Sequence, residues 1–177
     1  MYDISVFESE LESIQTPSIR DVVRSLFGLV PSYFWVVPAS SSGKYHPAYA
    51  TGEGGLVRHT KAAVRFCNEL RPLQNFTTVE FDFVIAALLL HDTWKQGDGA
   101  EGHTVFEHPL LAAGFVKDHA PEWFSEVVSP LIASHMGQWN TSKYAPGVRL
   151  PKPKNKLQRF VHECDYLASR KAFDVQF

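Results

Sequence analysis

The sequence predicts an all-α fold, a bundle of about six to eight helices joined by long loops. Several segments repeat apolar residues at intervals of three and four, as one face of a helix does, while the alternation typical of strands is nearly absent. The chain has 177 residues, of which 45% are hydrophobic, which suits one domain with a buried core. We therefore expect a single domain over 1–177, with a helical extension at 1–38 and a core at 39–172.

The first helices are predicted from start signals and apolar stripes. Thr16 and Pro17 begin a helix over 18–28, and a longer amphipathic helix is expected over 55–71. The segment Ser32–Val37 is a candidate short strand, closed off by a proline on either side.

The central helix is expected to run from a capping box at Thr77–Glu80 to His91, because this stretch is apolar on almost every side. Thr104–Glu107 is a second capping-box candidate, with Pro109 in the first turn of the helix that follows.

Two further helices complete the predicted bundle, one over 122–135 and one over roughly 154–172. Pro130 should kink the first of these or split it in two. Loops of unusual length in a compact helical domain more often carry function than not, and three are predicted here, at 38–54, 93–104 and 136–153.

Charge, cysteine content and hydropathy exclude several classes of protein. The formal net charge is −2, yet the segment 143–159 contains six basic residues and no acidic one. Cys67 and Cys164 are too few for a disulfide framework. No basic region followed by an apolar run opens the chain, and the apolar run Val84–Leu90 is too short to span a membrane. We expect a cytoplasmic protein without a membrane partner.

Three predicted helices place an ionisable residue on their apolar side, namely His59, His91 and Asp165. Burying such a group without a partner costs several kcal/mol. A hydrogen bond to a backbone carbonyl would explain any one buried histidine. Three inward groups, with Asp92 next to His91, are better explained by a shared cation, since imidazoles and carboxylates bind divalent metals.

The full set of candidate ligands has four histidines and two aspartates: His59, His91, Asp92, His108, His135 and Asp165. Such a set could hold two ions with Asp92 between them. Two ions can clamp a phosphate and lower the pKa of a water molecule.

These residues and their context resemble the H…HD…D signature of the HD superfamily of metal-dependent phosphohydrolases. The matching motifs are Gly54–Thr60, Leu89–Lys95, Glu107–Leu110 and Ser134–Gly137. The likeness covers roughly residues 40–170 and is nearest to stand-alone phage HD proteins and to the HD domain of bacterial 3′-to-5′ exoribonucleases.

The resemblance implies an HD-domain helical bundle and a role for each ligand. His59, His91, Asp92 and Asp165 would bind a first metal, and His108 and His135 would complete a second site that Asp92 also reaches. Lys95 would contact a substrate phosphate, which makes Asp92 and Lys95 the implied catalytic pair. The chain departs from the family pattern at Trp94, which could narrow the pocket or stack on a base, and at Met136, where a second histidine is usual.

Further substrate contacts are expected from the loops. Lys44 and His46 could bind phosphate or donate a proton, or belong to an ordinary polar loop. Lys143 and Arg149 belong to the basic segment, which could rim the pocket and attract polyanions or form a solvated loop. Trp139 and Tyr144 could stack on a base or pack in the core or at an interface, and His103 is the remaining histidine most suited to touching substrate.

The sequence thus predicts a phosphohydrolase that cleaves a phosphoester or phosphoanhydride bond in a nucleotide or short nucleic acid by metal-activated water. Two alternatives stay open, a two-iron HD-type oxygenase and a non-catalytic nucleotide-binding protein. The cofactor is expected to be two divalent ions, with Mn, Fe, Ni, Co, Zn and Mg all compatible. The expected partner is a phosphate-containing small molecule or short nucleic acid, and a homo-oligomer is an open alternative.

Overall fold

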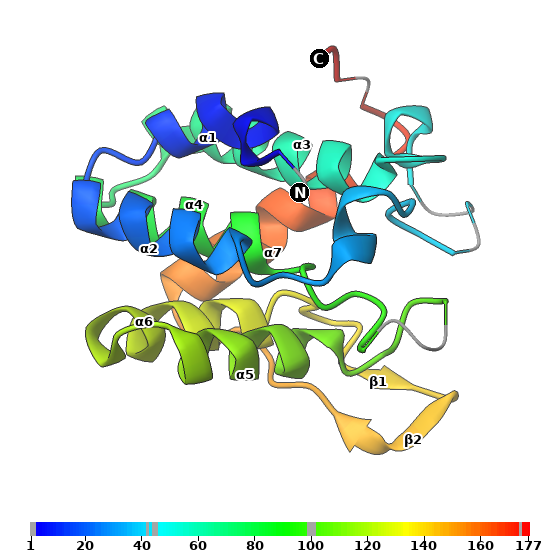
Figure 1. The fold of residues 1–177 in the computed structure, drawn as a ribbon. Coiled ribbons are helices and arrows are strands. Elements are labelled where there is room, and N and C mark those ends of the chain that lie inside the picture. The colour runs from blue at the N-terminus through cyan, green and yellow to red at the C-terminus, as the bar shows by residue number, and fades with distance from the viewer. Residues whose placement is uncertain (1–2, 42, 44–45, 99–101, 174) are drawn as a thin grey trace.

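The computed structural model describes residues 3–41, 43, 46–98, 102–173 and 175–177. Over these residues the chain forms seven α-helices, four short 3-10 helices and one two-stranded hairpin (Figure 1). The all-α prediction is confirmed, and the hairpin is an addition to it. In the described residues no helix has the length and apolar character needed to cross a membrane.

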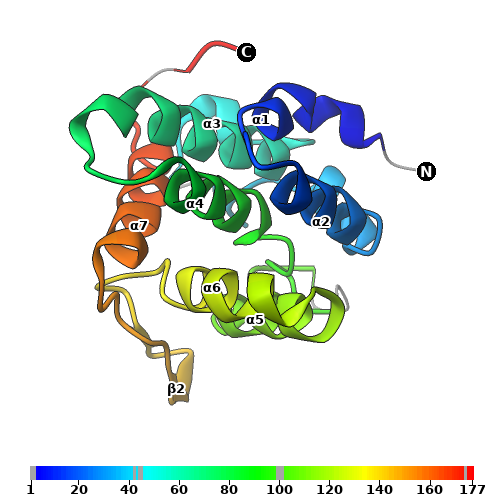
Figure 2. The same cartoon turned by 90° about the vertical axis from the view of Figure 1, so that its left-hand side faces the viewer.

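The central helix is α4 (Thr78–Leu90), whose side chains from Val84 to Leu90 are all buried. It contacts α2 (Pro17–Phe27), α3 (Gly55–Leu70), α6 (Glu122–Ala133) and α7 (Lys156–Ala168). Figure 2 shows α4 surrounded by these helices. The end of α4 at His91 therefore lies deep in the molecule.

Capping boxes start both α4 and α7. At α4, the Thr77 hydroxyl accepts from the Glu80 N–H at 3.2 Å and the Glu80 carboxylate accepts from the Thr77 N–H at 2.7 Å, which confirms the predicted start. Asn155 and Gln158 form the same arrangement at α7. Each capping box thereby satisfies two of the N–H groups that have no partner inside the helix.

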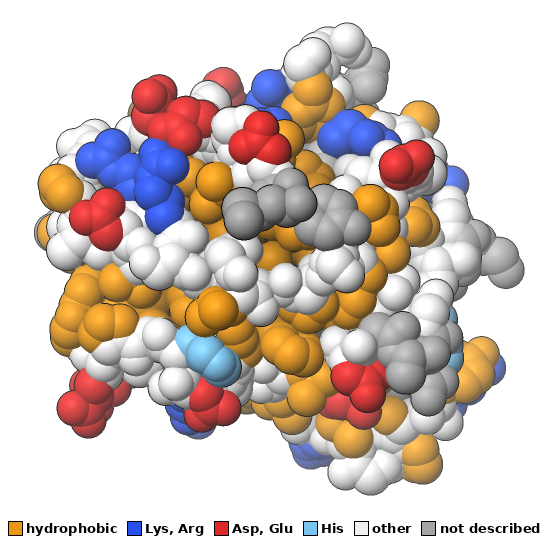
Figure 3. All heavy atoms as spheres, viewed as in Figure 1, with side chains coloured by type: hydrophobic (Ala, Val, Ile, Leu, Met, Phe, Trp, Pro, Cys, Tyr) orange, Lys and Arg blue, Asp and Glu red, His pale blue; other side chains and the backbone are white. Residues whose placement is uncertain are grey.

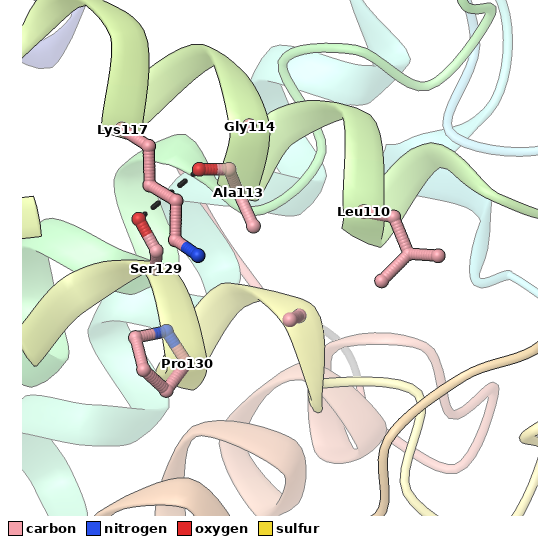
Figure 4. A pocket seen from close by; sticks show the side chains of 7 residues that line it. Leu110, Ala113, Gly114, Lys117, Ser129 and Pro130 are labelled. Atoms are coloured by element: carbon pink, nitrogen blue, oxygen red, sulfur yellow. Dashed lines mark hydrogen bonds between the residues drawn. The ribbon is translucent and has the colours of Figure 1, made fainter. Parts of the chain in front are cut away.

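The helices α5 (His108–His119) and α6 pack against each other beneath α2 and α4 (Figure 1). The Ser129 hydroxyl donates to the Ala113 carbonyl at 3.0 Å and joins the two helices (Figure 4). Leu110, Lys117 and Pro130 line a groove of about 220 Å³ beside this contact. Pro130 lies inside α6, which continues through it to Ala133, so of the two predicted effects, a kink or a split, the split does not occur.

The N-terminal segment covers one side of the core with aromatic rings. It contains η1 (Ile4–Phe7), α1 (Glu8–Glu12) and η2 (Ser32–Trp35). The predicted strand at Ser32–Val37 is wrong, because a single 3-10 turn there directs aromatic side chains into a buried cluster. The rings of this cluster lie 5.0 to 6.1 Å apart: Phe7, Phe27, Phe34 and Trp35. In Figure 3, apolar side chains cross the middle of the face formed by α2 and α5.

The start of α5 differs from the prediction. Its N-cap is Glu107, which makes no side-chain cap bond, so the capping box from Thr104 is wrong, while Pro109 does lie in the first turn. The Thr104 N–H instead donates to the Ser41 hydroxyl at 2.9 Å. A contact between two loops far apart in sequence has replaced the local cap.

The hairpin lies inside the segment predicted as a long loop over 136–153. It pairs β1 (Thr141–Ser142) with β2 (Ala145–Arg149) in antiparallel register. Asn140 and Leu150 close its base, with the Leu150 N–H donating to the Asn140 carbonyl at 3.0 Å. Figure 1 shows it projecting away from the helices. Two short 3-10 helices complete the fold, η3 (Ala48–Ala50) and η4 (Arg71–Leu73).

Candidate metal centre

Six ionisable side chains from five helices or their ends converge next to α4. They come from α3, from the end of α4 and the residue after it, from the start of α5, from the turn after α6, and from α7: His59, His91, Asp92, His108, His135 and Asp165. The Asp165 side chain is 17% exposed and each of the others is 2% exposed or less. The structure brings together all six residues that the sequence pattern selects.

Three of the imidazoles are oriented by their own chain. In each, Nδ1 lies within hydrogen-bonding distance of the carbonyl three residues earlier, and because a carbonyl only accepts, Nδ1 carries the proton. Their Nε2 atoms are then left to face the cluster, which is how a histidine is prepared as a metal ligand. The Nδ1 to oxygen distances are 2.6 Å for His91 to Leu88, 2.7 Å for His108 to Val105 and 2.8 Å for His135 to Ile132.

The Asp92 carboxylate lies at the middle of the cluster, and its two oxygens face different imidazoles. Oδ2 is 3.4 Å from His91 Nε2 and 3.7 Å from His59 Nε2. Oδ1 is 3.2 Å from His108 Nε2 and 3.6 Å from His135 Nε2. One carboxylate therefore joins two pairs of histidines.

Asp165 lies next to both His59 and His91, so these three residues form one group. Its Oδ1 lies 3.0 Å from His59 Nε2 and 3.5 Å from His91 Nε2. On the other side of the cluster, His108 Nε2 and His135 Nε2 are 3.2 Å apart. Two nitrogens bound to one ion at about 2.1 Å lie about 3.0 to 3.4 Å from each other, so this spacing suits a shared ion.

The cluster leaves buried polar atoms that a cation would satisfy. Among the described residues, His91 Nε2 and Asp92 Oδ1 are buried, face the cluster and have no hydrogen-bond partner. Such an atom costs about 1 to 3 kcal/mol. In the described part of the chain, two groups have ligand atoms within 4.8 Å of one another and could hold an ion. One is His59 with His91 and Asp165, and the other is His91 with Asp92 and His135. The residues present therefore fit a divalent metal.

Both carboxylates of the cluster stay ionised despite their burial. Burial opposes the charge on Asp92, but Lys95 and His91 outweigh it and hold the pKa of Asp92 well below its usual range. Burial also opposes the charge on Asp165, and hydrogen bonds with His59 and His91 lower its pKa in the same way. A metal site requires this protonation state.

The imidazoles divide into neutral and charged groups. Burial, reinforced by His91, lowers the pKa of His135 to about 3, and burial also lowers that of His108. Burial disfavours the charge on His91 as well, but the Asp92 and Asp165 carboxylates outweigh it and raise the His91 pKa to about 10. The metal-free cluster therefore holds a proton that a bound cation would displace.

The cluster opens into a cleft of about 650 Å³. Lys95 and His46 line it together with His108 and Asp165. The Lys95 ammonium is 2.6 Å from Asp92 Oδ2. The His46 ring lies edge-on to His59 with centroids 5.0 Å apart, and burial, aided by His59, lowers the His46 pKa to about 3.

Other predicted substrate contacts lie elsewhere. Trp94 packs against Phe115, with ring centroids 5.7 Å apart. Lys143 lies on the hairpin turn with its ammonium 4.9 Å from the Tyr144 ring centre, and Arg149 is exposed at the end of β2. The described residues that line the cleft do not include Trp94, Lys143, Arg149 or Tyr144. Lys44 falls outside the described residues.

The cleft residues that were not predicted from the sequence include Tyr166 and Arg170, which lie beside Trp139 and His103. The sequence signal that points to Tyr166 and Arg170 is their position, one and five residues after Asp165. A ligand near the end of a helix brings the residues that follow it to the border of the same space.

The turn that carries His135 is fixed by a close contact between Gly137 and His162. Gly137 has a φ of +57°, and a Cβ there would lie 2.3 Å from the His162 ring. The His162 Nδ1–H donates to the His135 carbonyl at 2.7 Å.

We expect Gly137→Ala to lower the free energy of unfolding by about 2 to 3 kcal/mol in urea denaturation, because it adds a clash to a strained backbone.

Gly147→Ala is the matched control. A Cβ at Gly147 meets no atom of the described structure within 4 Å, so its unfolding free energy should stay within about 0.5 kcal/mol of the parent. Equal stability of the two variants would contradict the proposed contact.

A family model described as HD domain matches residues 56–170. No curated protein and no solved structure gives a significant match to the chain. The matched range contains all six converging side chains and extends to Arg170.

Proposed function

Because the chain belongs to the HD-domain family, a superfamily of metal-dependent hydrolases, we propose that it cleaves a phosphoester or phosphoanhydride bond in a nucleotide or a short nucleic acid. The observation that carries the proposal is the buried cluster of four imidazoles and two carboxylates at the base of a cleft. The cleft also contains the Lys95 ammonium, a donor suited to a phosphate oxygen.

We propose that this cluster holds two divalent ions. His59, His91 and Asp165 would bind one of them together with Asp92 Oδ2. The other would be bound by His108, His135 and Asp92 Oδ1. The support is the division of the Asp92 oxygens between the two pairs of histidines.

When bound, the ions would supply Lewis acidity toward phosphate and lower the pKa of a water molecule. Asp92 would fix the separation of the two sites through its two oxygens. Lys95 would stabilise charge on the phosphate, and its contact with Asp92 holds it at the cleft wall. The neutral His46 could donate or accept one hydrogen bond with the substrate from the opposite loop.

The direct test is a substrate panel with metal-reconstituted protein. The chain is stripped of metal, reloaded separately with Mn, Fe, Co, Ni, Zn or Mg, and assayed on p-nitrophenyl esters, nucleotides, cyclic nucleotides, dinucleotides and short RNA and DNA. We expect hydrolysis of at least one of these with at least one metal. Absence of hydrolysis under every condition would refute the proposal, and a product formed only with dioxygen would favour an oxygenase.

Metal binding should also stabilise the fold. A ligand at 100 times its dissociation constant adds about 2.7 kcal/mol, which should raise the melting temperature by about 5 to 10 °C for a chain of this size. Elemental analysis should then give two ions per chain. A content near one ion per chain would mean that His108 and His135 do not bind a second metal ion.

The control for metal binding is His119→Ala. His119 is exposed at the far end of α5 from His108, and its loss should leave both the metal count and the metal-induced rise in melting temperature unchanged. A rise that persisted in His91→Ala as strongly as in His119→Ala would place the ion somewhere else.

A further inference from the structure

One wall of the cleft is formed by two aromatic rings and a guanidinium group. Trp139 and Tyr166 are stacked with ring centroids 5.4 Å apart and planes at 17°. The guanidinium carbon of Arg170 lies 4.4 Å from the Tyr166 ring centre and 5.8 Å from that of Trp139. All three residues line the same cleft as Lys95 and Asp165.

Unlike Arg24 and Lys61, Arg170 has no acidic partner in the described part of the chain. The Arg24 guanidinium forms an ion pair with Glu8, and the Lys61 ammonium forms one with Glu10. Arg170 donates from Nε and Nη2 to the Ser169 hydroxyl, and in the described part of the chain no carboxylate lies within ion-pairing distance of it. A cation at a cleft wall without a carboxylate is free to bind an anionic group of a ligand.

The wall lies beside the proposed metal site and is separate from it. Arg170 follows Asp165 by five residues and lies two residues beyond Ala168, the last residue of α7, and both residues line the same cleft. An anionic group bound by Arg170 would therefore be a neighbour of the phosphate at the metals. Trp139, which is 42% exposed, offers a ring for a base, since every nucleobase can stack on an aromatic side chain.

We propose that Trp139, Tyr166 and Arg170 form a binding site for the nucleotide next to the scissile bond, so that the substrate is a short single-stranded nucleic acid. This inference rests on the proposed phosphohydrolase function and narrows its substrate. A guanidinium group binds phosphate through directed hydrogen bonds, and aromatic stacking with basic side chains is how single strands are held without a fixed sequence. A substrate with one phosphate and no base would use neither feature.

The test compares a generic ester with nucleic acid. Metal-reconstituted protein is assayed on bis(p-nitrophenyl) phosphate, on a 5′-phosphorylated dinucleotide and on a single-stranded hexanucleotide. We expect kcat/KM for the two nucleic acids to exceed that for the ester by about tenfold or more, which corresponds to about 1.4 kcal/mol. Arg170→Ala should lower kcat/KM on the dinucleotide at least ten times further than on the ester.

Two further variants separate binding from structure. Trp139→Ala should weaken hydrolysis of the nucleic acids selectively, and Trp139→Phe should restore most of it because a ring remains available. Arg71→Ala is the matched control, because Arg71 also lies over an aromatic ring, 4.6 Å from the Phe81 centre, but is not among the residues of the cleft. Its preference for nucleic acid over the ester should equal that of the parent.

The outcomes distinguish this inference from the proposed function. Hydrolysis of the ester without preference for nucleic acid, or an equal loss on all substrates in Arg170→Ala, would overturn the inference and leave the phosphohydrolase assignment intact. If no substrate is hydrolysed, the phosphohydrolase assignment fails, and fluorescence anisotropy with a labelled hexanucleotide still decides the inference. Equal affinity of the parent and Arg170→Ala would then overturn it.

Discussion

Asp92→Asn is expected to lower kcat/KM for hydrolysis by about a thousandfold or more, equivalent to a loss of about 4 kcal/mol of transition-state stabilisation. Asparagine keeps the size of the side chain but offers one neutral oxygen where two charged ones stood. Because Oδ1 and Oδ2 face different histidine pairs, the substitution should weaken both proposed metal positions together. The measurements are kcat/KM on the best substrate and the metal content per chain.

Asp118→Asn controls for the loss of a carboxylate. Asp118 is exposed on α5, so its variant should keep the activity and metal content of the parent. Asp92→Asn protein that is folded and still active at more than a tenth of the parent rate would contradict the central role of this carboxylate. His91→Ala should behave like Asp92→Asn, because its Nε2 lies within 3.5 Å of both carboxylates.

Asp82→Ala is expected to lower the free energy of unfolding by about 2 to 4 kcal/mol, because it removes hydrogen bonds to a fully buried carboxylate. Asp82 projects from α4 to the start of α2, where it accepts from the Gln15 and Thr16 N–H groups at 3.0 and 2.8 Å. It also accepts from the Thr16 hydroxyl at 2.6 Å. The carboxylate thus joins the N-terminal segment to the central helix.

The change should appear in urea denaturation and as a fall of about 5 to 15 °C in melting temperature. Asp82→Asn should lose less, since its amide oxygen still accepts. Asp21→Ala is the control, because Asp21 is exposed on α2 and should shift stability by about 0.5 kcal/mol or less. If Asp82→Ala were as stable as Asp21→Ala, the contact would contribute nothing to the fold.

The sequence predicted those structural features that depend only on residues close together in the chain. The capping box at Thr77 and the apolar stripes of α2, α3 and α4 each depend on residues within a few positions of one another. The same stripes identified His59, His91 and Asp165 as inward groups. The failures came where distant segments intervene, as at Thr104, which binds Ser41 in place of its own helix, and at Ser32–Val37, which turns to bury aromatic rings.

The helical class, the family resemblance and the types of side chain available to a metal could all be predicted from the amino-acid sequence. How these side chains meet could not be predicted, because His59, Asp92 and His135 come from segments whose separation in space depends on how whole helices pack. The division of the Asp92 oxygens between two histidine pairs is such a feature. So is the wall of Trp139, Tyr166 and Arg170, which forms where the turn after α6 meets the end of α7.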